Sequence, residues 1–225
     1  MLHAWGLLEA HTPRKVVFPR LGVHVTKAAI PEKNPLRGIV KSVGSDPVDL
    51  VVLSTEGREG LPRSFQPSVA EGVVRHLHAP ALFVPSAAGG FADANTDELS
   101  LRSVLIPLAH DLSPQRAIDT CIAILETLVV TPQCIDLVHI GTDCPTVNTS
   151  AQGGWNWQQH VFEGEAVESL LAAAHNLSPD LVVIPTKGHH GFLDAFRGGD
   201  TERLVRHAPW PVLAVPVTSA GLKTV

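Results

Sequence analysis

The sequence has few features of the proteins that bind nucleic acids or cross membranes. Its 17 Lys and Arg residues are outnumbered by 22 Asp and Glu residues, which gives a formal net charge of −5. The basic residues are scattered, so there is no electrostatic case for a nucleic-acid partner. No apolar run is long enough to span a membrane, and we expect no signal peptide. A soluble, cytoplasmic protein without a membrane partner is therefore expected.

Cysteine is also scarce, and its spacing favours neither disulfide bonds nor a metal site. The three cysteines, Cys121, Cys134 and Cys144, are an odd number and lack the spacing of zinc ligands. Cys121 falls on the apolar stripe of a predicted helix that Ser113 and Pro114 open. We therefore predict that Cys121 is a buried thiol rather than a reactive one.

The common catalytic signatures are missing as well. There is no nucleophile elbow, no zinc-protease helix motif and no P-loop with its lysine and serine. We predict that the protein is not an enzyme.

The most informative stretch lies near the C-terminal end of the sequence. Residues 181–184 form a short, β-branched apolar run, which predicts a buried parallel strand. A loop with the sequence GHHG follows at residues 188–191, and Gly198 and Gly199 then precede a predicted helix. Residues 212–215 supply another buried strand. A glycine-lined turn at a helix N-terminus exposes unpaired N–H groups, which suit an anion such as phosphate.

This stretch is repeated earlier in the chain. Residues 49–85 align with residues 180–216 without a gap, so that Asp49 matches Asp180 and Pro85 matches Pro216. The same register extends backwards into a predicted helix with apolar residues at i, i+3, i+4 and i+7. These are Leu36, Ile39, Val40 and Val43 in the first copy, opposite Val167, Leu170, Leu171 and Ala174 in the second. The chain is therefore predicted to be a tandem duplication.

The second copy resembles a universal stress protein domain. The resemblance implies an α/β fold of two flavodoxin- or Rossmann-like parallel sheets with strand order 3-2-1-4-5. Nucleotide-binding members of this family carry glycine, two residues, glycine, nine residues, glycine, then serine or threonine. The corresponding positions are Pro185, Gly188, Gly198 and Gly199 in the second copy and Ser54, Gly57, Pro67 and Ser68 in the first. Neither copy keeps the full pattern.

The resemblance divides the chain into a truncated copy at residues 1–88, a linker at 89–99 and a complete copy at 100–225. The first copy lacks a counterpart of residues 103–120, which form the first strand and most of the first helix. Residues 1–6 resemble the second strand, and residues 22–30 alternate enough to form the third. The gap has three explanations: a misplaced gene start, direct pairing of strands two and four, or a strand from another chain.

The resemblance also implies how the copies associate. Domains of the family pair through their last strands, so residues 81–84 and 212–215 are predicted to meet in an internal pseudo-dimer. We also expect the chain to form a homodimer.

A ligand site is expected beyond the carboxyl ends of strands one and four, where the winding of the sheet reverses. Nucleotide-binding relatives place an aspartate at the position of Ala109, and alanine does not make the hydrogen bonds of that carboxylate. The resemblance therefore implies a degenerate nucleotide cleft that takes ATP or AMP weakly or not at all. The predicted ligand-binding residues are Ala109, Lys187, Gly188, Arg197, Gly198 and Gly199.

The same crevice offers ligands for zinc, which imidazole and carboxylate groups bind well. The candidates are His110, Asp111, His189 and His190. The alternatives are loop histidines bonded to backbone or solvent, and a polar contact to a small molecule. His139, His160, Trp155 and Trp157 are predicted to be structural.

Three functions follow from these observations. The first is a non-enzymatic stress-response protein with a degenerate nucleotide cleft. The second is a zinc-binding protein, and the third is an interaction module without a ligand.

Overall fold

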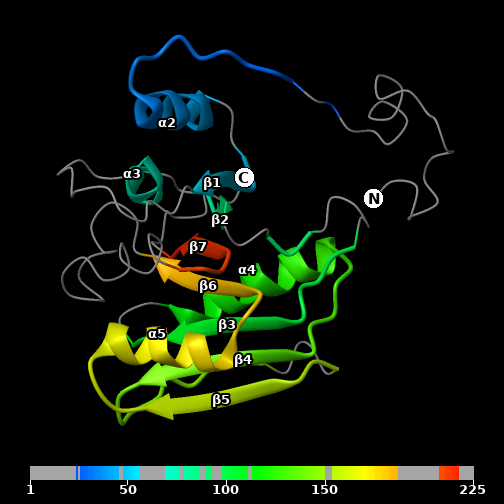
Figure 1. Ribbon diagram of the computed structural model, residues 1–225, viewed down its shortest axis with the longest axis vertical. Helices are drawn as coiled ribbons and strands as arrows, with labels where there is room; N and C mark the ends of the chain where they lie inside the picture. The colour runs from blue at the N-terminus through cyan, green and yellow to red at the C-terminus, as the bar shows by residue number, and fades with distance from the viewer. Residues whose placement is uncertain are drawn as a thin grey trace, which may run out of the picture.

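A mixed β-sheet of seven strands runs through the described part of the molecule (Figure 1). The structure is a computed structural model that describes residues 24, 26–45, 48–55, 69–76, 79–86, 90–92, 98–110, 113–149, 154–186 and 208–217. The strands are β1 (Val51–Thr55), β2 (Ala81–Pro85), β3 (Ser103–Leu108), β4 (Cys134–Ile140), β5 (Trp157–Phe162), β6 (Leu181–Thr186) and β7 (Val212–Pro216). The helices are α2 (Pro35–Ser45), α3 (Val69–His76), α4 (Pro114–Thr127) and α5 (Ala166–Leu177). The strand order in the sheet is β1-β2-β7-β6-β3-β4-β5.

The second copy has the predicted five-stranded sheet. Its strands lie in the order β5-β4-β3-β6-β7, and every neighbouring pair is parallel. Numbered within the copy this is 3-2-1-4-5, so the predicted fold is confirmed. The residues of β6 and β7 are all buried, because strands covered on both faces are apolar throughout.

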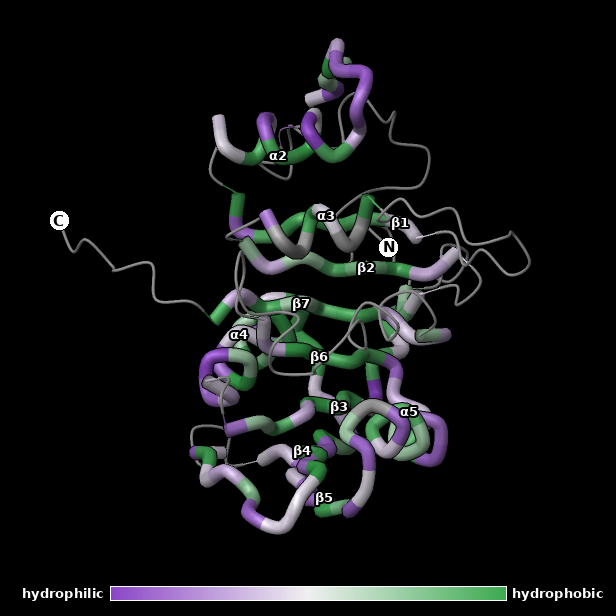
Figure 2. The backbone as a smooth tube through the Cα atoms, turned by 90° about the vertical axis from the view of Figure 1, so that its left-hand side faces the viewer, coloured by the Kyte–Doolittle hydropathy of each residue, from purple (hydrophilic) through white to green (hydrophobic). Residues whose placement is uncertain are grey.

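Helices cover both faces of this sheet and enclose two apolar cores (Figures 1 and 2). Helix α5 contributes Leu170, Ala173 and Ala174 to one core, and α4 packs against the opposite face. Pro114 is the first residue of α4, as predicted, because the fixed φ of proline suits a position that needs no N–H. The buried face of α4 is the predicted one, with Ala117, Ile118, Cys121, Ile122 and Leu125.

The first copy is represented by α2, β1, α3 and β2. Asn34 precedes α2, and its side-chain oxygen Oδ1 accepts a hydrogen bond from the backbone N–H of Arg37 at 3.2 Å. This is the predicted N-terminal cap. The apolar stripe of α2 packs against the same core as Val51 and Leu53, on one face of β1. None of the helices in the ranges described is long and apolar enough to cross a membrane.

The two copies meet where β2 and β7 pair antiparallel and join the strands into one sheet. Residues 81–84 and 212–215, which the resemblance brought together, are the segments in contact. Leu82 lies opposite Leu213, which is its own counterpart in the gap-free alignment of the copies. The pairing is therefore symmetric about these two leucines, as in an isologous contact.

The predicted third strand of the first copy is wrong over the residues that can be assessed. In the segment 22–30, residues 24 and 26–30 are described, and none belongs to a strand. All six are exposed. Alternating side chains make a segment suitable for a strand, but its N–H and C=O groups must also pair with a neighbouring strand. Residues 1–6, the predicted second strand, lie outside the described ranges.

Candidate functional site

The predicted crevice lies beyond the carboxyl ends of β3 and β6, which are adjacent in the sheet. The connection through α4 leads from β3 to β4 on one side, and the connection through α5 crosses back to β6 on the other. The winding direction therefore reverses between β3 and β6, where open α/β sheets bind their ligands. The position of the reversal agrees with the prediction.

Two of the predicted site residues are described at this reversal. Ala109 directly follows β3 and is half-buried, and His110 comes next and is exposed. The other predicted residues lie outside the described ranges. They are Asp111, Lys187, Gly188, His189, His190, Arg197, Gly198 and Gly199.

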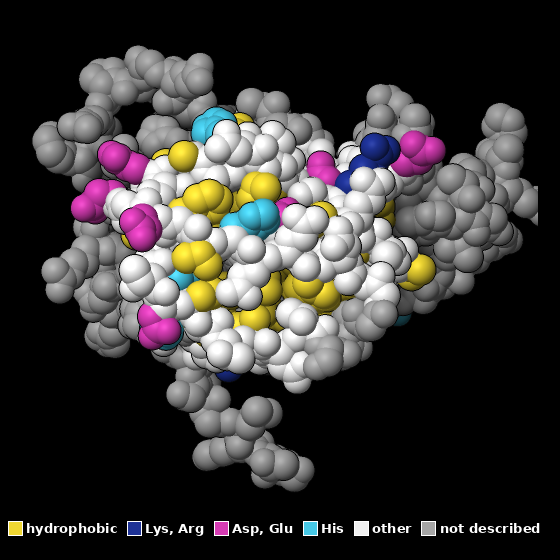
Figure 3. Space-filling view, turned by 90° about the horizontal axis from the view of Figure 1, so that it is seen from below, with side chains coloured by type: hydrophobic (Ala, Val, Ile, Leu, Met, Phe, Trp, Pro, Cys, Tyr) yellow, Lys and Arg dark blue, Asp and Glu magenta, His cyan; other side chains and the backbone are white. Residues whose placement is uncertain are grey.

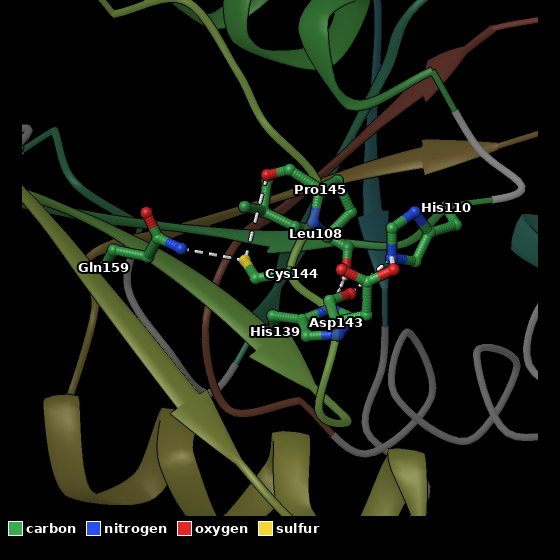
Figure 4. A network of polar contacts seen from close by, with 7 residues as sticks. All are labelled: Leu108, His110, His139, Asp143, Cys144, Pro145 and Gln159. Carbon is green, nitrogen blue, oxygen red and sulfur yellow. Dashed lines mark hydrogen bonds and ion pairs between the residues drawn. The ribbon is translucent and has the colours of Figure 1, made fainter.

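The His110 ring is engaged by the loop that follows β4 (Figure 4). Its Nε2 contacts the backbone oxygen of Asp143 and lies 3.7 Å from the carboxylate oxygen Oδ2 of the same residue. The ring also stands edge-on to that of His139, with 5.7 Å between the ring centroids. His110 therefore links the ends of β3 and β4, on the side of β3 that is remote from β6.

His139 holds the same two strand ends together from the inside. It is buried, and its Nδ1 is hydrogen-bonded to the backbone oxygen of Leu108 at 2.9 Å. Gly141 follows with a φ of +135°, and a Cβ on it would lie 3.1 Å from Nε2 of His139. Glycine is required there both by the backbone conformation and by the close approach. His139 is thus a structural residue, as predicted.

Cys144 lies in the same loop and is held by a neighbouring strand. The side-chain amide of Gln159 donates a hydrogen bond to its Sγ at 2.9 Å. Burial raises the pKa of the Cys144 thiol, the Gln159 hydrogen bond partly offsets this, and the Asp143 charge raises the pKa further. The thiol therefore remains protonated near neutral pH and is a poor nucleophile.

The other two thiols are held in the protonated form more strongly. Burial raises the pKa of Cys121 to about 12 and, together with Asp136, that of Cys134 from 9.0 to about 11. Near pH 8, a rise of two pKa units lowers the thiolate fraction about a hundredfold. We expect the folded protein at pH 8 to react with iodoacetamide far more slowly than the unfolded protein. Rapid labelling of Cys134 or Cys144 in the native state, located by mass spectrometry, would contradict this.

A second polar cluster lies on the sheet face that α5 covers. The Asp136 side chain is buried on β4, and its Oδ1 accepts a hydrogen bond from Nε2 of His160 on β5 at 2.7 Å. The thiol of Cys134 lies 3.5 Å from the same oxygen. The pair joins two neighbouring strands of one sheet within a largely apolar layer. Sequence reasoning placed His160 as structural but missed Asp136, although an acidic residue within the apolar run IDLVHI was a signal.

The surface at the β5 end of the sheet is apolar at its centre, with acidic side chains around much of its rim (Figure 3). Val161 and Phe162 on β5 are 50% and 37% exposed. Trp155 and Trp157 stack at 6.3 Å and pack against the core beneath α4. The two tryptophans are therefore core residues, as predicted, rather than a platform for a ligand.

The described residues do not form a metal site. No group of three or more His, Cys, Asp or Glu side chains among them is placed to hold an ion. A shallow hollow of about 270 Å³ is found away from the strand ends. It is lined by Ala29, Ile30, Pro31, Glu32, Lys41, Ser42 and Ser45.

The fold defines a class of protein with a doubly wound parallel sheet and a reversal between its first and fourth strands. The model of the universal stress protein family matches residues 10–85 and 134–216. The chain belongs to the universal stress protein family. The two matched segments fall in the two copies of the duplication.

Solved structures of the same family share the fold. A universal stress protein from Archaeoglobus fulgidus superposes with a TM-score of 0.64 and 16% identity, over 92% of this chain and 76% of that protein. Universal stress protein UspA from Lactobacillus plantarum matches 51% of this chain and 97% of its own, with 14% identity and a TM-score of 0.39. An Arabidopsis thaliana family protein with AMP bound matches 52% of this chain and 93% of its own, with 14% identity and a TM-score of 0.36. No curated protein matches the chain.

Proposed function

We propose that the protein is a non-enzymatic stress-response protein with a degenerate nucleotide-type cleft between β3 and β6. Membership of the universal stress protein family supports the stress-response role. The fold supports the place of the cleft, because ligands of open α/β sheets bind at the reversal of winding. We also propose that the protein works in the cytoplasm, because its three free cysteines suit a reducing compartment.

The observation that carries the proposal is the composition of the end of β3. Ala109 supplies no side-chain hydrogen bond at the mouth of the cleft, and the ring of His110 is engaged by Asp143. A nucleotide would therefore be held chiefly through its phosphates, by the backbone at Gly188, Gly198 and Gly199 and by basic side chains. Lys187 and Arg197 are the basic residues of that segment. We expect weak binding, because the base and ribose receive little recognition from β3.

Restoring a carboxylate at the end of β3 tests this cleft. We expect Ala109→Asp to tighten AMP binding about tenfold, because a hydrogen bond to a charged group contributes about 1.5–3 kcal/mol. Thermal shifts with ATP, ADP and AMP, followed by calorimetric titration, would measure the effect. Ala172→Asp is a matched control, because it adds the same charge on an exposed position of α5.

The outcomes of this experiment separate two of the proposed functions. A shift for Ala109→Asp that exceeds those of the wild type and Ala172→Asp supports a degenerate cleft. If no nucleotide raises the melting temperature of any of the three proteins, nucleotide binding is to be dropped in favour of an interaction module.

Zinc remains the second candidate ligand, through His110, Asp111, His189 and His190. The engagement of the His110 ring by Asp143 speaks against it, because binding zinc through Nε2 would require that contact to break. Elemental analysis before and after dialysis against zinc tests this candidate. A stoichiometric, His110-dependent metal content would favour zinc over the nucleotide.

The β2–β7 pairing supports an internal pseudo-dimer as the assembly of the two copies. A homodimer of the whole chain is a separate proposal, and it would use another surface because these last strands are already paired. Sedimentation velocity at several concentrations would establish the mass of the assembly.

A further inference from the structure

Strand β1 has the sequence of an interior strand but lies at an edge of the described sheet. It pairs with β2 on one side, and no strand of the described ranges pairs with its other side. Its counterpart β6 has β7 on one side and β3 on the other. Edge strands are usually protected from further pairing by charged residues, proline or a bulge. The segment VVLST has no charged residue and no proline.

The exposure of equivalent residues in the two copies shows what is missing beside β1. Leu50 is 37% exposed and Val52 59% exposed, whereas their counterparts Leu181 and Val183 are 2% and 0% exposed. Leu181 and Val183 are buried in the core that α4 covers. The uncovered side chains therefore mark the place where a strand and helix equivalent to β3 and α4 would lie.

Asp49 adds a polar recognition element to this edge. Its counterpart Asp180 accepts hydrogen bonds at Oδ2 from the backbone N–H groups of Arg102 at 2.7 Å and Ser103 at 2.9 Å. Asp180 thereby fixes the beginning of β3 against β6. Asp49 occupies the same position before β1 and is exposed. The first copy keeps the carboxylate that receives an incoming strand.

We propose that Asp49, Leu50 and Val52, together called the β1 edge, form a docking site for a strand–helix segment of a second polypeptide. The incoming strand lies parallel to β1 and has about six apolar residues, as β3 does. Its first two N–H groups donate to the Asp49 carboxylate. The amphipathic helix that follows covers Val52, as α4 covers Val183.

The register of docking follows from the second copy. Val104 pairs with Leu181 and Leu105 with Val182. In the gap-free alignment Leu181 matches Leu50, so the residue of the incoming strand that corresponds to Val104 lies opposite Leu50. A peptide of residues 101–127, which contains β3 and α4, therefore has the chemistry that this site recognises.

The test adds that synthetic peptide to the full-length chain. Fluorescence anisotropy of the labelled peptide measures binding, and hydrogen–deuterium exchange locates it. We expect saturable binding and slower exchange in β1, with no change in the opposite edge strand β5. A peptide with Leu105→Pro is the control, because proline removes an N–H and disrupts strand pairing.

Variants of the full-length chain test the individual contacts. We expect Asp49→Ala to weaken peptide binding about tenfold, because two hydrogen bonds to a carboxylate are lost. Val52→Lys should weaken it similarly, whereas Val161→Lys on β5 should have no effect. Val161 is a matched control because it is 50% exposed on an edge strand.

Three results would overturn the proposal. The first is no binding, which would mean that other residues of the chain already occupy the edge. The second is altered exchange in β6 rather than β1, which would mean that the peptide exchanges with the chain's own β3. The third is equal weakening by Val52→Lys and Val161→Lys, which would indicate nonspecific apolar association.

Discussion

Replacing His160 with leucine should lower the free energy of unfolding by about 3 kcal/mol, because it leaves a buried carboxylate without its partner. Asp136 is 3% exposed, and its Oδ1 is 2.7 Å from Nε2 of His160. The remaining neighbour of that oxygen, the thiol of Cys134 at 3.5 Å, is a weak donor. Urea unfolding followed by circular dichroism measures the change.

The second half of this experiment removes both polar groups. Asp136→Val combined with His160→Leu should recover most of the lost stability, because apolar residues of similar size often replace a buried polar pair at little cost. A double-mutant cycle then gives the coupling energy between the two side chains. If the double variant is as unstable as His160→Leu alone, the loss comes from packing and not from the unpaired carboxylate.

The second copy could be predicted almost completely because its local signals agree with one another. The apolar run of β6 is too short for a helix and is β-branched, and the buried stripe of α4 has helical spacing. The gap-free duplication then assigned β1 and β2 from their better-defined counterparts. Residues 22–30 were predicted wrongly because their alternation is a local property, whereas a strand requires a partner.

The candidate site was only partly predictable, because its contacts join segments that are distant in the sequence. The sequence placed His110 at the end of β3, but its partner Asp143 belongs to the loop after β4. Similarly, the pairing of Asp136 with His160 depends on the register between β4 and β5, in which Val138 lies opposite His160. Hydrophobic patterns determine which residues form strands, but they do not give the registers that bring polar side chains together.

The two aspartates that precede β6 and β1 should differ sharply in their contribution to stability, although they are equivalent in sequence. Asp180→Ala should lower the free energy of unfolding by about 2–3 kcal/mol, because two buried-end N–H groups of β3 lose a charged acceptor. Asp49→Ala should change it by less than about 0.5 kcal/mol, as is usual for an exposed residue. Chemical unfolding of both variants under identical conditions gives the comparison.

The contrast isolates what the carboxylate does from the identity of the residue. The same substitution is made at matched positions of the duplication, so a difference in stability arises from the strand that each aspartate contacts. The backbone N–H of Asp180 also donates to Ser103 at 2.9 Å, and alanine retains this bond, so the experiment reports on the side chain alone. Equal losses in the two variants would show that Asp49 already holds a strand within the isolated chain. Equal neutrality would show that the carboxylate of Asp180 does not hold β3 in place.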